Sequence, residues 1–165
     1  MPLTSRRHLV AGLLALSAAT PLSAQTAPAP TRFSRVVVDV DRLKALGLGR
    51  FAEFVRAAAA DEAAKVFADR IGPGGATLVV RLTGLSMRSY TGSSSLKGSS
   101  GMGENDFLEG EALILGPGGA VLARKPQLLP LPASSGGAWY AEDGERRRAE
   151  IISRTYVQWL RRTLG

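Results

Sequence analysis

The sequence contains no cysteine and a single histidine, His8. Without cysteine, the chain forms neither a disulfide nor a thiolate metal site. Because His8 lies in a segment that we expect to be removed, the mature protein would also lack histidine. These absences exclude a Ser-His-Asp triad, a Cys-His pair and every histidine-ligated metal. No cofactor motif is found either, so we expect no cofactor and no catalytic residues.

Acidic residues are also few, at 14 against 21 basic residues, which gives a formal net charge of +7. Most of the basic residues are arginine, in a chain that is also rich in alanine and glycine. Two explanations stay open: the amino-acid usage of a GC-rich genome, or a partner that carries negative charge. The length of 165 residues suits one domain.

The N-terminus has the pattern of a secretory signal peptide over residues 1–24. Arg6 and Arg7 form a basic start, Leu9–Ala19 is apolar, and Leu22-Ser23-Ala24 offers a cleavage site. The paired arginines resemble the bacterial twin-arginine motif, although general secretory signals also contain such pairs. We therefore expect a periplasmic or secreted protein that does not span the membrane after cleavage. Export argues against a nucleic-acid partner.

The spacer at residues 25–31, QTAPAPT, has no periodicity and predicts a disordered linker. Residues 32–165 are then expected to form one domain. Apolar residues alternate in Phe33–Val40 and in Thr77–Met87, which indicates two strands. Helical periodicity predicts helices over Arg50–Ile71 and Glu142–Leu164, and a turn or short helix over Asp41–Gly49.

A hairpin is the strongest local signal in the chain. Phe107–Leu115 and Ala120–Leu129 both have strand character, and the connection between them reads GPGG. In the first of these runs, Leu108, Ala112 and Ile114 fall on one apolar face. The prolines of the second run predict an edge strand; they are Pro126, Pro130 and Pro132.

The expected order is strand, helix, three strands, helix (β-α-β-β-β-α). This order predicts an α+β fold, with a single four-stranded sheet and two helices packed on one face. The closing helix should bury one stripe of residues, namely Ala149, Ile152, Tyr156, Trp159, Leu160 and Thr163. The Gly/Ser-rich segment Thr91–Gly103 predicts a loop, and whether it orders on binding stays open.

Carboxylates cluster at Glu104, Asp106, Glu109 and Glu111. Such a group would suit a hard cation, but Arg81 and Lys125 are expected on neighbouring strands. We therefore interpret the cluster as a solvated, cross-strand-paired face. The alternative is an exported hydrolase or carbohydrate-binding protein. It would need at least two of these carboxylates and Asp39 to converge in a concave site beside an aromatic residue such as Trp139, Tyr140 or Tyr90.

Three arginines, Arg147, Arg154 and Arg161, recur every seven residues along the closing helix. They form a candidate stripe for an anionic partner, such as an anionic membrane surface, and the plain alternative is a solvated helix face.

The phrase Asp106–Glu111, DFLEGE, precedes a strand and a glycine turn. Together with the signal peptide and the order of elements, it resembles small bacterial envelope domains, those of the lipopolysaccharide-assembly lipoprotein and of the periplasmic part of the curli-secretion channel. No functional residue is carried over from this resemblance. The export signal, the absence of nucleophile–base pairs and the two small-residue loops at 91–103 and 133–138 predict a non-catalytic binding or envelope-assembly module, with an envelope protein as a candidate partner. The oligomeric state is left open.

Overall fold

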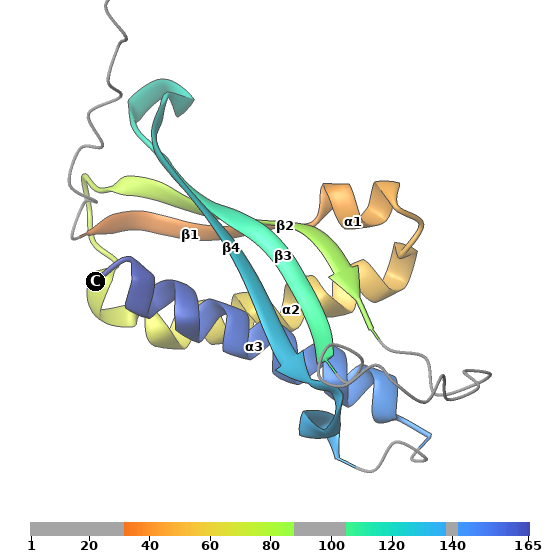
Figure 1. The fold of residues 1–165 in the computed structure, drawn as a ribbon. Helices are drawn as coiled ribbons and strands as arrows, with labels where there is room; N and C mark the ends of the chain where they lie inside the picture. The colour runs from red at the N-terminus through yellow and green to blue at the C-terminus, as the bar shows by residue number, and fades with distance from the viewer. Residues whose placement is uncertain (1–31, 88–104, 138–141) are drawn as a thin grey trace, which may run out of the picture.

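The computed structural model describes residues 32–87, 105–137 and 142–165 (Figure 1). The predictions for the signal peptide at 1–24 (including Arg6 and Arg7), the linker at 25–31 and the loop at 91–103 concern residues outside this described part. The same holds for Tyr90, Glu104, Trp139 and Tyr140.

The described residues form four strands and three helices, with short 3-10 turns between some of them. The strands are β1 (Phe33–Asp39), β2 (Ala76–Ser86), β3 (Asn105–Leu115) and β4 (Val121–Pro132), and the helices are α1 (Asp41–Ala45), α2 (Gly49–Val66) and α3 (Gly144–Thr163). The 3-10 turns are η1 (Ala68–Arg70), η2 (Pro117–Gly119) and η3 (Ala133–Gly136). This arrangement confirms the α+β class and the single sheet.

The sheet is mixed, and its strand order follows the sequence, β1-β2-β3-β4. β1 runs parallel to β2, which requires the crossover through α1 and α2, whereas β2, β3 and β4 are antiparallel neighbours. α2 and α3 pack against each other along one side of the sheet (Figure 1). The short helix α1 contacts β2, which extends beyond the end of β1.

The core lies between the sheet and the two long helices. The sheet contributes alternate residues such as Leu78, Val80 and Leu82 from β2, all fully buried. α2 contributes mainly alanine, including the buried Ala52, Ala59 and Ala63. Small side chains allow a helix to lie close to its neighbours, which keeps α2 near both the sheet and α3.

The predicted hairpin is present, and η2 forms its turn. Gly118 and Gly119 have φ angles of 71° and 83°, a region that glycine enters without steric cost. The prediction of β4 as an edge strand is also confirmed. β4 extends through Pro130 to Pro132, because an edge strand needs hydrogen bonds on one side only.

The prediction that Trp159 is buried is wrong, since 46% of this residue is exposed. The buried side of α3 includes Ala149, Ile152, Tyr156 and Leu160, as expected, but Trp159 lies at its border and Thr163 is exposed. Helical periodicity locates the centre of a buried stripe. Its borders depend on which neighbouring elements reach that far.

Replacing Trp159 with alanine should therefore lower the free energy of unfolding by no more than about 1 kcal/mol. The fully buried Ile152 is the matched control on the same helix, and Ile152→Ala should cost about 2–5 kcal/mol. Urea unfolding of the two variants measures the difference. Equal losses would contradict this placement of the helix face.

Candidate binding surface

A ladder of alternating charges crosses the face of the sheet that α2 and α3 leave uncovered. Arg81 on β2 donates to Asp39 on β1 at 3.0 Å and to Glu111 on β3 at 3.3 Å. Arg124 on β4 lies 3.3 Å from the other oxygen of Glu111. Each strand thus supplies one member, and the predicted cross-strand pairing of this face is confirmed for Arg81 and Glu111.

The expected partner on β4 was Lys125, and that part of the prediction is wrong. Lys125 stands opposite Ala112, a core-face residue, so its side chain starts on the other face of the strand. Arg124, one position earlier, stands opposite Leu113 and reaches Glu111. A shift of one residue along a strand exchanges its two faces, and sequence alone does not fix that register.

The ladder holds Asp39 in its charged form. Partial burial alone would raise the pKa of this carboxyl. The hydrogen bonds from the backbone N–H of Asp41, at 3.0 Å, and from Arg81 outweigh burial, so the pKa of Asp39 lies below its ordinary value. Asp39 is therefore an anchored acceptor rather than a proton donor at neutral pH.

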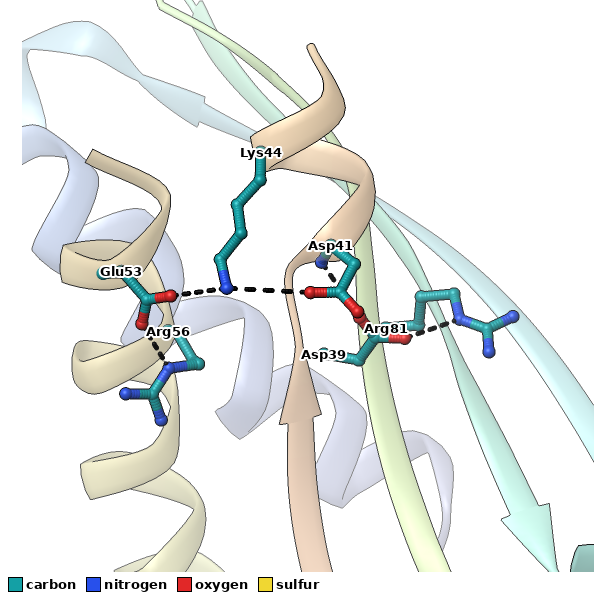
Figure 2. A network of polar contacts seen from close by, with 6 residues as sticks. All are labelled: Asp39, Asp41, Lys44, Glu53, Arg56 and Arg81. Carbon is teal, nitrogen blue, oxygen red and sulfur yellow. Dashed lines mark hydrogen bonds and ion pairs between the residues drawn. The ribbon is translucent and has the colours of Figure 1, made fainter. Parts of the chain in front are cut away.

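The ladder continues into a second polar network around α1 (Figure 2). Lys44 on α1 lies 2.6 Å from Glu53 on α2 and 3.6 Å from Asp41, and Arg56 pairs with the same Glu53 at 2.7 Å. The hydrogen bond to Lys44 lowers the pKa of Glu53. These groups are exposed, so each pair contributes little to stability. The contacts link α1 to α2 through Lys44 and Glu53, and to the end of β1 through the N–H of Asp41.

A hollow of about 560 Å³ lies on the uncovered face, beside the ladder. The turn before β2, with Gly74 and Gly75, forms one wall, and the hairpin turn at 116–119 forms another. Thr77 and the exposed Arg35 provide its polar side chains together with Ser34. Among the described residues, no carboxylate pairs with Arg35, which makes it a cation available to a ligand.

The three arginines of the predicted stripe on α3 are each paired with a carboxylate. Arg147 lies 3.2 Å from Asp143, and Arg154 lies 2.6 Å from Glu150. Arg161 is turned toward α2: it donates to the carbonyl oxygen of Val66 and to Asp69, both at 3.0 Å. Arg161 therefore has a structural contact that the sequence did not indicate. The anionic-partner role of the stripe stays a prediction.

Asp106 and Arg148 form a buried ion pair that the sequence analysis missed. Asp106 is 2% exposed and Arg148 is 5% exposed. The Nε of Arg148 donates to Oδ2 of Asp106 at 2.8 Å, and its Nη2 donates to Oδ1. Interpreting Asp106 as solvated was wrong. The alternation of residues along β3 does indicate that Asp106 is buried, because Asp106 lies on the same face of the strand as Leu108 and Gly110.

The carboxylates that a hydrolase would need do not all share one face of the sheet, and the two that meet at Arg81 are both held in ion pairs. Asp39 and Glu111 lie on the uncovered face, whereas Asp106 is buried beneath the other face. Over residues 32–87, 105–137 and 142–165, no three His, Cys, Asp or Glu residues gather in a way that would hold a metal ion. None of the helices in these ranges is long and apolar enough to cross a membrane.

Neither a protein-family model nor a curated protein sequence matches this chain.

Proposed function

We propose that this chain is an exported, non-catalytic module of the bacterial periplasm that binds an envelope protein through the uncovered face of its sheet. The observation that carries the proposal is the hollow between the two glycine-rich turns, with Arg35 at its wall. The export pattern at residues 1–24 supports the compartment. The resemblance of Asp106–Glu111 and its surroundings to small envelope domains supports the role in binding or assembly.

The chemistry of this face favours a protein partner that presents an acidic group. Arg81, Glu111 and their neighbours in the ladder pair with one another, so they offer a polar surface with little net charge. Arg35 adds one cation, and Ser34 and Thr77 add hydroxyl groups beside it. When a partner binds, these polar groups lose their water. They therefore select a partner whose charges and hydrogen-bonding groups match their own, rather than one with a large hydrophobic surface.

The alternative of a carboxylate-dependent hydrolase has less support. Such chemistry needs two carboxyl groups that face each other across a cleft. Glu111 is engaged by two arginines, and Asp106 is buried with Arg148. Neither arrangement leaves a carboxyl group positioned as a general acid.

Site-specific photo-crosslinking in cells tests the proposal. A photoreactive residue at Thr77, inside the hollow, should give a crosslinked product with an envelope protein that mass spectrometry identifies. The matched control places the same residue at the exposed position Glu145 on α3, which should give no such product. Fractionation in the same cells should find the protein in the periplasm, and Arg6→Lys/Arg7→Lys should retain it in the cytoplasm if the twin-arginine route is used.

Two results would contradict the proposal. One is a protein that remains in the cytoplasm although its N-terminus is intact. The other is an exported protein for which Thr77 and Glu145 give the same products, because the hollow would then have no role in binding.

A further inference from the structure

The two edges of the sheet differ in how well they are protected from pairing. Along β4, the prolines at 126, 130 and 132 all occupy positions of the same parity, and each removes an N–H donor, so this edge resists an additional strand. Along β1, Ile71 bridges to Phe33 at the start of the strand. From Ser34 to Asp39, no strand among the described residues pairs with β1 on the side away from β2.

This open edge of β1 contains no proline, and its centre is Val36–Val38. Alternate residues of an edge strand direct their N–H and C=O groups outward, which makes the edge a template for another strand. Valine is among the residues that favour strands. Val37 is also 39% exposed, and the nearby Ile71 is 45% exposed. Apolar surface therefore accompanies the unpaired backbone groups.

Hollows flank the edge on both faces of the strand. The hollow of about 560 Å³ on the uncovered face and a second one of about 320 Å³ toward α2 are both lined by Ser34 and Arg35. The wall of the second hollow includes Ala60 and Ala64 of α2. Because strand side chains alternate between the two faces, both faces have room beside β1. The alanines also allow a helix to approach closely.

The sequence of this edge is complementary to itself. Residues 35–39 read Arg-Val-Val-Val-Asp, with Val37 at the centre. If two copies of β1 pair in antiparallel fashion about Val37, Arg35 of each copy stands opposite Asp39 of the other, on the same face of the sheet. Among the described residues, Arg35 has no carboxylate partner. Arg81 already holds the Asp39 side chain on that face at 3.0 Å.

We propose that two copies of this chain associate through β1, pairing antiparallel about Val37 into one continuous sheet with two-fold symmetry. Such an interface is isologous, so one complementary pair of residues yields two cross-strand ion pairs. The two-fold axis also places the two α2 helices side by side on the covered face, with their alanines between them. The exposed Val37 and Ile71 then lie at or beside the interface. The interface uses Arg35 and Val37, which also line the hollow of the proposed envelope site, so a second copy and an envelope partner would compete for them.

A single introduced cysteine tests the register directly, because the chain has none of its own. Val37→Cys should give a disulfide or a short-bismaleimide dimer in high yield, since position 37 of one copy meets position 37 of the other. The matched control is Leu128→Cys on the β4 edge, which is 57% exposed and should give no crosslinked dimer under the same conditions. Light scattering should give twice the monomer mass for the wild type.

A charge reversal tests the pairing without a crosslinker. Arg35→Glu places like charges opposite each other at both symmetric positions and should weaken dimerisation by more than about tenfold. Circular dichroism should show a folded variant, because Arg35 is exposed. A wild type that stays monomeric well above micromolar concentration would overturn the proposal. So would equal crosslinking from positions 37 and 128, or crosslinking from position 37 only to a different protein.

Discussion

Replacing Arg148 with methionine should lower the free energy of unfolding by about 3–5 kcal/mol, the largest loss that we expect from a single polar residue. Methionine keeps much of the apolar volume but removes the guanidinium that donates to both oxygens of Asp106. The carboxylate is only 2% exposed, so the change would remove the guanidinium of Arg148 from a charge that solvent barely reaches. Urea denaturation with an unchanged m-value measures the loss.

A second variant distinguishes two quantities: the stability lost when only Arg148 is removed, and the net stability that the Asp106–Arg148 pair contributes. Because both partners are desolvated, Asp106→Leu/Arg148→Met should be far more stable than Arg148→Met and close to the wild type. The double-mutant cycle then gives a large coupling energy between the two positions. A loss below about 1 kcal/mol for Arg148→Met would show that solvent reaches Asp106 and that the pair is effectively a surface one.

This ion pair links the first turns of α3 to the start of β3. Gly136 in η3 lies against Arg148, and a Cβ atom at position 136 would fall 2.3 Å from the Cγ of that arginine. Asp106 lies near the start of β3, and η3 directly follows β4. Arg148 therefore connects the first turns of α3 to the end of the sheet, and glycine at 136 provides the space for its side chain.

The elements of the fold could be predicted from the sequence because each one has a local signal. Alternation in Phe33–Val40, the GPGG connection and the helical spacing of Ile152, Tyr156 and Leu160 are all confirmed by the described residues. The boundaries differ by a few residues. The predicted helix at Arg50–Ile71 ends earlier, at Val66, and η1 follows it.

The predictions that were wrong concern features that depend on contacts between elements distant in the sequence. Arg148 is one of three consecutive arginines, and its spacing of four from Ile152 puts it on the buried side of α3, but no local pattern indicates that Asp106 is its partner. Trp159 was placed in the core because the border of a helix stripe depends on its neighbours. The sequence predicts Lys125 as the partner on β4, whereas Arg124 occupies that face, because neither strand alone determines the register of β4 against β3. The hollow beside Arg35 brings together two turns that are far apart in the sequence, so no local motif indicated it.

Gly110 is the position where the smallest substitution should have the largest effect on packing. A Cβ atom on Gly110 would lie 2.3 Å from the carbonyl oxygen of Arg81, 2.8 Å from the hydroxyl of Tyr156 and 3.1 Å from the Cα of Leu82. Two of these atoms belong to the backbone of β2, so no side-chain rotation relieves the contact. The alternation of β3 predicted a small or apolar residue here but not that glycine is required.

We therefore expect Gly110→Ala to lower the free energy of unfolding by about 3 kcal/mol, at the upper end of overpacking effects. Combining it with Tyr156→Phe should not restore stability, because the closest contact is to the Arg81 carbonyl. The single change Tyr156→Phe should be neutral or stabilising, since the Tyr156 hydroxyl is buried and has no hydrogen-bond partner among the described residues. Burial, with a further contribution from Glu111 and Glu109, also raises the pKa of Tyr156 above its ordinary value.

Gly84→Ala is the matched control, because Gly84 lies in the neighbouring strand β2. Its Cβ atom would lie 3.2 Å from Oε2 of Glu109, the far end of a flexible side chain that can move away. We expect this variant to stay within about 0.5 kcal/mol of the wild type. Thermal and urea unfolding of both alanine variants distinguish a specific clash from a general cost of altering strand glycines. Similar losses at positions 84 and 110 would contradict the close packing of Gly110 against β2, since the two sites differ mainly in what surrounds the added methyl group.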